Sequence, residues 1–75
     1  MPEVKTSLVV VCHLDGLLEE RGLTLTALSD MVGVSVVNLS VMKNNRAKAI
    51  RYSTLSAICA ALDCQPGDLL TVESN

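Results

Sequence analysis

Basic side chains gather in one short stretch of this chain, directly after a run rich in valine. Four of the six basic residues lie within nine positions, and these are Lys43, Arg46, Lys48 and Arg51. Such side chains can bind phosphate oxygens through charge-assisted hydrogen bonds. The preceding segment, positions 35–44, reads SVVNLSVMKN. Its methyl, hydroxyl and amide groups can contact the edges of nucleic-acid bases. The chemistry indicated is therefore noncovalent recognition.

Two short amphipathic segments would position these side chains. The first is predicted to be a helix over residues 25–32, with Thr24 as its N-cap and with Leu28 and Val32 facing inward. Gly33 suits the left-handed conformation that commonly ends a helix. The chain is therefore expected to turn at this glycine.

The second segment begins at Ser35, its predicted N-cap, and continues to about position 43. A turn of about 100° per residue places Leu39 and Met42 against the first helix. Asn38 is expected beside them, partly buried and bonded to nearby backbone. Residues 24–44 thus have the outline of a helix-turn-helix. The opposite face of the second helix consists of Val36, Val37, Ser40, Val41 and Asn44.

Three further helices are predicted around one aliphatic core. One covers residues 14–21, where leucines repeat at helical spacing and Gly22 follows. Another begins after Ser53 as N-cap and ends near position 63, and Pro66 opens a last short turn. The fold class is therefore all-α, with five helices in a single domain spanning residues 1–75.

The two ends of the chain have strand-like composition. Residues 8–12 read LVVVC and residues 69–73 read LLTVE. Neither strand is stable alone, so they are expected to pair, either within one molecule or with a second copy. Residues 1–7 are expected to be a loosely structured lead-in.

The bulk composition excludes several classes of function. The chain has 75 residues, is 49% hydrophobic and contains Tyr52 as its one aromatic residue, which argues against base stacking of the single-strand or RNA-binding type. No apolar run approaches the roughly 18 residues of a membrane span, and no signal-peptide pattern is found, so we expect a cytoplasmic protein. The net charge of −2 does not oppose DNA binding, because the acidic residues lie apart from the basic stretch.

Neither a metal site nor a catalytic site is expected. The three cysteines, Cys12, Cys59 and Cys64, are odd in number and lack paired-ligand spacing, which indicates reduced thiols. No nucleophile–base pair or phosphate-cradling glycine loop is recognisable. An enzyme would require a deep pocket containing His13 or the cysteines. We therefore predict no catalysis, no cofactor and no small-molecule ligand.

Two uses of the valine face remain open. Valine methyl groups in a major groove can contact thymine methyl groups, which would give modest, A·T-leaning specificity. Three clustered valines can equally form a contact with another protein. The basic stretch favours DNA, since cations after such a helix can clamp flanking phosphates, although Lys43 and Arg46 could instead serve only the helix dipole.

Two longer motifs carry a resemblance to a known family. The segments NLSVMKN (38–44) and AIRYSTLSAICAALDCQPGD (49–68) resemble those of small Xre or lambda-repressor-like helix-turn-helix regulators, and the match covers roughly residues 11–72. The resemblance implies five helices and DNA binding through the helix after Ser35 by a homodimer on a two-fold site. Leu25 stands where the class often has a glutamine that bonds to phosphate, and His13 stands where a capping asparagine is common.

By position, the resemblance carries the base-facing role onto Val36, Val37, Ser40 and Val41. We therefore predict a sequence-specific regulator of transcription that places this helix in the major groove of double-stranded DNA. The alternative is a protein-interaction module, of the antitoxin or phage accessory type, that uses the valine face on a partner. The residues predicted to contact the DNA backbone are Ser35, Lys43, Asn44, Arg46, Lys48 and Arg51.

Overall fold

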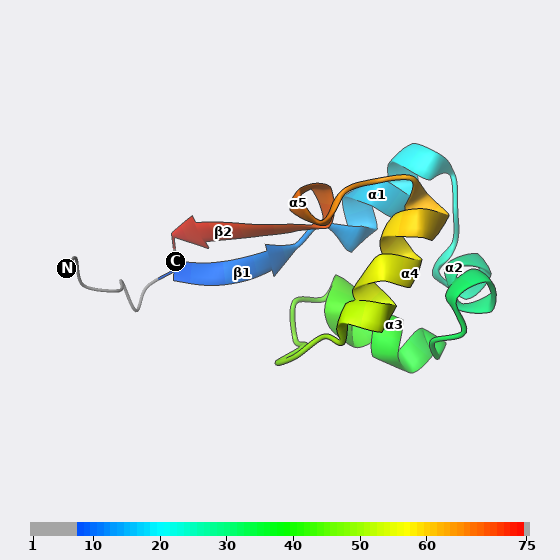
Figure 1. The fold of residues 1–75 in the computed structure, drawn as a ribbon, viewed down its shortest axis with the longest axis horizontal. Helices are drawn as coiled ribbons and strands as arrows, with labels where there is room; N and C mark the ends of the chain where they lie inside the picture. The colour runs from blue at the N-terminus through cyan, green and yellow to red at the C-terminus, as the bar shows by residue number, and fades with distance from the viewer. Residues whose placement is uncertain (1–7, 75) are drawn as a thin grey trace.

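Over residues 8–74, five helices form a body from which a two-stranded antiparallel ribbon projects (Figure 1). The computed structural model describes residues 8–74, so the lead-in expected over residues 1–7 lies outside the described residues. The prediction of five helices with paired terminal segments is confirmed. In chain order the elements are β1 (Leu8–Cys12), α1 (Leu14–Arg21), α2 (Leu25–Val32), α3 (Val36–Lys43), α4 (Tyr52–Leu62), α5 (Pro66–Leu69) and β2 (Leu70–Ser74).

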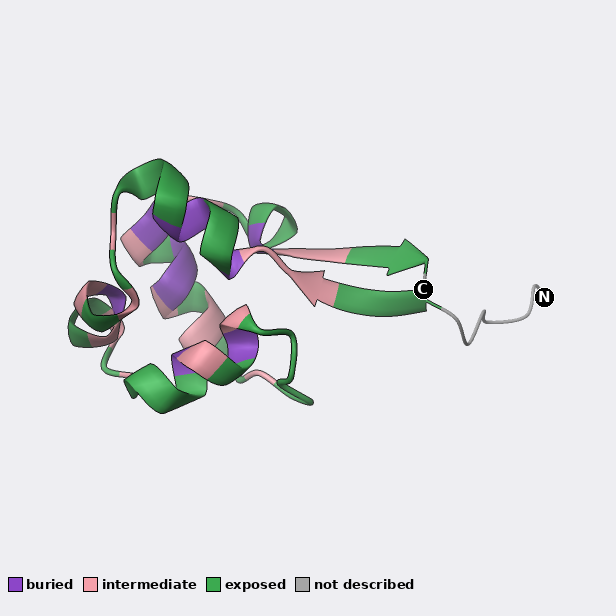
Figure 2. Cartoon of the chain, turned by 180° about the vertical axis from the view of Figure 1, so that it is seen from behind, coloured by how far each residue is buried: buried purple, intermediate pink, exposed green. Residues whose placement is uncertain are grey.

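One aliphatic cluster holds the helices together. In Figure 2 the buried segments lie on the helices, and the ribbon is half-buried or exposed. Burying one such side chain stabilises the fold by about 1.5–3 kcal/mol, so this cluster dominates the packing. Its buried members are Leu14, Leu17, Leu18, Leu28, Leu39, Met42, Ile58, Cys59, Leu62 and Leu69.

Helix boundaries follow local hydrogen bonding. The Thr24 side chain accepts from the backbone N–H of Ala27 at 3.0 Å, which confirms the predicted cap of α2. Gly33 ends that helix at φ 72°, in the left-handed conformation. The predicted cap of α4 is wrong: the extended residue before the helix is Arg51, so Ser53 lies inside the first turn. Helix α5 begins with Pro66, as expected.

A side chain of α1 ties the ends of two helices together. Nε of Arg21 donates to the carbonyl oxygen of Leu62 at 2.8 Å, and Nη2 donates to that of Asp63 at 3.4 Å. These carbonyls lie at the end of α4, where peptide oxygens lack helical partners and attract a cation. The contact fixes α4, which packs against the helix-turn-helix.

The terminal strands pair within one chain, which resolves the alternative left open by the sequence. Their antiparallel register aligns Val10 with Val72 and Cys12 with Leu70. The expected strand over 69–73 is shifted by one residue, because Leu69 belongs to α5. At the base of the ribbon, His13 makes no capping bond to α1, and its Nε2 instead lies 2.7 Å from Oγ1 of Thr71.

Candidate nucleic-acid interface

The turn between α2 and α3 has the geometry of a helix-turn-helix. The chain bends by 119° between the two helices, within the usual range of about 90–120°. The hydroxyl of Ser29 donates to the carbonyl oxygen of Val34 at 2.6 Å and closes the turn. Ser35 then caps α3, because its Oγ accepts from the backbone N–H of Asn38 at 3.1 Å. Both predicted caps of the unit, Thr24 and Ser35, are confirmed.

Helix α3 has one buried and one exposed face. Leu39 and Met42 belong to the core, as predicted. The three valines face outward: Val36 is 39% exposed, Val37 is 71% exposed and Val41 is 37% exposed. Val37 is therefore largely available to another molecule, whereas Val36 and Val41 are each partly covered by the fold and partly available.

Two polar residues of α3 differ from each other in setting. Asn38 is exposed, so the prediction that it is partly buried is wrong. Ser40 is half-buried, and its Oγ accepts from Nδ2 of Asn44 at 3.4 Å. The exposed amide of Asn38 was passed over as a contact residue, although its position one turn before Val41 places it near that valine.

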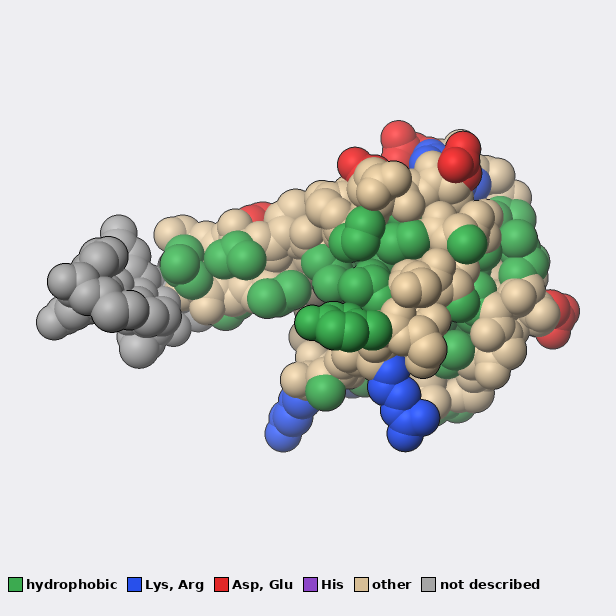
Figure 3. Space-filling view, in the orientation of Figure 1, with side chains coloured by type: hydrophobic (Ala, Val, Ile, Leu, Met, Phe, Trp, Pro, Cys, Tyr) green, Lys and Arg blue, Asp and Glu red, His purple; other side chains and the backbone are tan. Residues whose placement is uncertain are grey.

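The basic residues after α3 are not equivalent. Lys43 is half-buried, and its Nζ lies 3.7 Å from Oδ1 of Asp15 in α1. This partly exposed ion pair is worth at most about 1 kcal/mol, so it does not prevent Lys43 from binding a phosphate. Arg46, Lys48 and Arg51 are exposed. In Figure 3, basic side chains project from one edge of the molecule, and a group of acidic side chains lies at the opposite edge.

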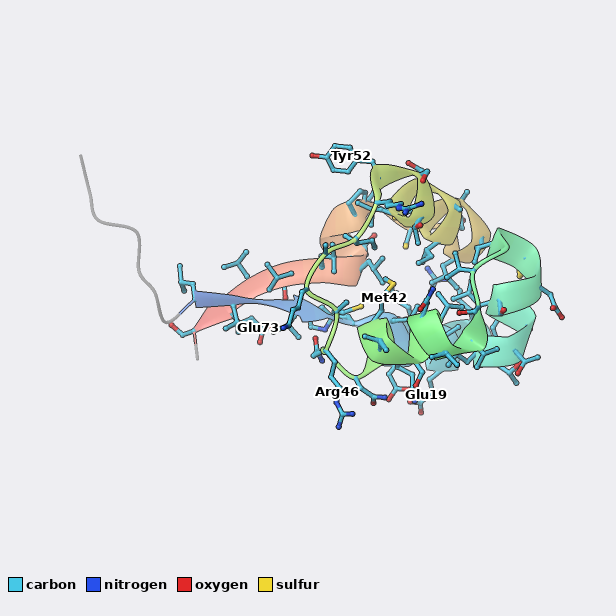
Figure 4. All side chains as sticks on the ribbon, turned by 90° about the horizontal axis from the view of Figure 1, so that it is seen from below. Glu19, Met42, Arg46, Tyr52 and Glu73 are labelled. Atoms are coloured by element: carbon cyan, nitrogen blue, oxygen red, sulfur yellow. The ribbon has the colours of Figure 1, made fainter. Side chains whose placement is uncertain are left out.

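The loop that carries these cations has a defined conformation. Asn45 adopts φ 61°, and its Oδ1 accepts from the backbone N–H of Cys12 at 2.6 Å. The backbone N–H of Arg46 donates to the carbonyl oxygen of Val41 at 2.9 Å. Figure 4 shows the Arg46 side chain pointing away from the body, whereas Met42 points into it. The loop therefore presents its arginine beside α3.

A groove of about 730 Å³ lies between α3 and the start of α4. It brings together five of the predicted contact residues, and it leaves Val36, Val37, Ser40, Lys43 and Asn44 outside its lining. Helix α4 has no side-chain cap, so its first amides contribute partial positive charge to this region. Sequence reasoning missed Ser53 and Thr54, which become groove residues because α4 begins before them. The predicted residues in the lining are Ser35, Val41, Arg46, Lys48 and Arg51.

The cysteines are free thiols in settings that suit structural roles. Burial raises the pKa of the Cys12 thiol above its ordinary value. Burial, and after it the neighbouring Cys59, raises the pKa of the Cys64 thiol. Raised pKa values keep both thiols protonated at neutral pH, whereas a nucleophilic cysteine needs a lowered one. Cys59 is buried in the core, as predicted.

None of the described helices is both long and apolar enough to cross a membrane by itself. Helices α2 and α3 meet the length and composition criteria only as a pair, across the 119° bend.

A capped helix-turn-helix with an exposed second helix and an adjoining cationic loop defines a DNA-binding domain of the helix-turn-helix class. Residues 13–75 match the Cro/C1-type HTH DNA-binding domain, and the chain belongs to this family. It is thus a member of a family of DNA-binding transcriptional regulators, as the motifs at positions 38–44 and 49–68 led us to expect.

Two relatives support this assignment. The chain is 48% identical over 68 residues to the uncharacterized HTH-type transcriptional regulator YozG of Bacillus subtilis (strain 168), a match that covers 91% of this chain and 81% of YozG. The crystal structure of the transcriptional regulator VanUg (Form II) aligns with a TM-score of 0.75 at 25% identity, covering 100% of this chain and 99% of VanUg. The latter alignment includes the ribbon, whereas the family match begins after β1.

Proposed function

We propose that this protein is a sequence-specific regulator that inserts α3 into the major groove of double-stranded DNA. The observation that carries the proposal is the outward-facing valine surface of α3 beside the exposed cations of the following loop. An apolar face of this kind selects thymine methyl groups, while the loop cations supply sequence-independent affinity. Such a regulator acts in the cytoplasm of a bacterial cell and without catalysis.

The roles divide by position. Val36, Val37 and Val41 contact thymine methyl groups, and Ser40 can donate its hydroxyl proton to a base while it accepts from Asn44. No residue of this face can make the bidentate contact of arginine with guanine, so specificity leans toward A·T pairs. The residues assigned to the phosphate backbone are Ser35, Lys43, Asn44, Arg46, Lys48 and Arg51.

Binding as a homodimer follows from the small footprint of one helix. A single recognition helix contacts only a few base pairs, which cannot mark one site in a genome. In a two-fold dimer the two copies of α3 would lie about 34 Å apart, one helical turn of DNA. The alternative function, a protein-interaction module, would also use the exposed valines. Membership of a family of DNA-binding regulators favours DNA binding instead.

Selection of bound sequences from a random duplex pool tests the proposal. We expect enrichment of a thymine-containing motif repeated with two-fold symmetry, with half-site centres about 10 base pairs apart. The variant Val37→Asp should enrich no motif, because it places a carboxylate among phosphates, and its folding should be unaffected because Val37 is 71% exposed. Recovery of random sequence by the wild-type protein would contradict sequence-specific binding.

A further inference from the structure

The ribbon has one apolar face that its own chain leaves largely uncovered. Because side chains alternate along a strand, the antiparallel register places Leu8, Val10 and Cys12 on the same face as Leu70 and Val72. The opposite face carries Val9, Val11, Thr71 and Glu73. On the apolar face Leu8 is 42% exposed, Val10 is 62% exposed and Val72 is 64% exposed.

The position of the ribbon makes this exposure costly. The ribbon extends away from the helices along the long axis of the molecule (Figure 1), which measures 44 Å against 21 and 20 Å for the other two axes. A two-stranded ribbon is marginally stable in water unless another surface packs on it. Exposed valine-rich strands are also prone to uncontrolled association. A specific partner for the apolar face would remove both liabilities.

The same chain carries a hollow that fits apolar side chains. A groove of about 280 Å³ lies between the base of the ribbon and the loop after α3, with walls from Cys12, Leu70, Ala49 and Ile50 and with Met42 among its lining residues. Figure 3 shows hydrophobic side chains extending from the ribbon onto the body beside it. Tyr52, at the start of α4, is 86% exposed and points toward the side from which the ribbon projects (Figure 4).

We propose that the occupant of this groove is the ribbon of a second copy of the chain, in a two-fold interface. One chain carries both the apolar ribbon face and the groove. An isologous contact requires both, because each copy then places its ribbon in the groove of the other. The inference rests on the proposed function, since it names the surface through which the DNA-binding dimer forms.

The area of the ribbon face alone is too small for a stable dimer interface. Five residues per strand give a face about 17 Å long, and two strands with their side chains are about 10 Å wide, or roughly 170 Å². A stable interface buries about 800 Å² on each partner. The contact must therefore include the groove and the exposed ring of Tyr52, so substitutions at both places should weaken it.

Sedimentation velocity of the full chain tests the interface with a matched pair of variants. Val10→Lys places a charge on the apolar face, and Val9→Lys makes the same change in the same strand on the opposite face, opposite Glu73. We expect a dimer for the wild type at micromolar concentration, an unchanged dimer for Val9→Lys, and at least a tenfold higher dissociation constant for Val10→Lys, since the interface cannot bury an unpaired ammonium.

Each outcome bears on the proposal separately from DNA binding. If circular dichroism shows that Val10→Lys does not fold, Tyr52→Ala provides the test of the interface. This variant should also weaken the dimer. A wild type that stays monomeric at high concentration, or variants on both faces that dimerise equally, would overturn the interface. If Val10→Lys dissociates the dimer but the dimeric wild-type protein binds no duplex, the interface is supported and the proposed function is contradicted.

Discussion

The backbone N–H of Cys12 donates to Oδ1 of Asn45 at 2.6 Å and so joins the end of β1 to the loop that carries the basic residues. These residues are 33 positions apart in the chain. Asn45 also adopts φ 61°, a conformation that asparagine tolerates better than most residues. One side chain therefore both shapes the loop and fastens it to the ribbon.

Replacement of Asn45 should separate these two contributions. Asn45→Ala removes the hydrogen-bond acceptor and places alanine, which tolerates positive φ less well than asparagine, at this position. We expect the free energy of unfolding to fall by about 1–2 kcal/mol. Asn45→Gly loses the acceptor but accepts the backbone conformation, so it should be less destabilised than the alanine variant. Urea denaturation measures both. Equal destabilisation by alanine and glycine would show that the backbone conformation contributes little.

Two arginines in different settings should behave differently when they are replaced. Arg46→Ala removes an exposed cation beside α3, so affinity should fall alike for all duplexes and the slope of log K against log salt should become about 1 unit shallower. Arg21→Ala removes a side chain that bonds to the carbonyl oxygens ending α4, so it should lower stability and leave the salt slope unchanged. Fluorescence anisotropy at several salt concentrations and thermal unfolding distinguish the two. An unchanged salt slope for Arg46→Ala would remove that arginine from the interface.

The raised pKa of the Cys12 thiol predicts a pH dependence of stability. Burial disfavours the thiolate in the folded protein, while the unfolded chain ionises near the ordinary value of 9.0. Ionisation therefore favours unfolding, and the contribution of this thiol to stability is present below that pH and is lost as pH rises through the folded pKa. The stability difference between the wild type and Cys12→Ala should narrow above pH 9.0. A difference that is constant with pH would contradict the shift.

Local signals predicted most of the helices, and non-local contacts explain what they missed. Thr24, Gly33 and Ser35 were placed correctly because caps and left-handed glycines depend on neighbouring residues. The cap of α4 was misplaced at Ser53, since no side-chain bond marks the true boundary at Arg51. Spacing alone could not orient Asn38 finely enough to place it on the exposed side.

The outward face of α3 was predictable from the sequence, but the arrangement of the residues around it was not. The exposed valines and cations follow from helical periodicity and charge clustering. The pairing of Lys43 with Asp15 and the groove between α3 and α4 depend on how distant segments pack, which no local pattern encodes. The pairing of the ribbon within one chain has the same origin, because strands at the two ends can satisfy each other or a second copy equally well.

In the proposed complex, valine methyl groups of α3 contact thymine methyl groups in the major groove. Its most direct test is the affinity of the wild-type protein for a selected duplex in which each thymine is replaced in turn by deoxyuridine, which lacks only that methyl group. Burial of one methyl-sized group is worth about 0.8 kcal/mol, so affinity should fall about fourfold at each contacted position. In the Val37→Ala variant, deoxyuridine at the position that Val37 contacts should reduce the affinity by less than it does in the wild type. Equal affinity for thymine and deoxyuridine at every position would contradict this account of recognition.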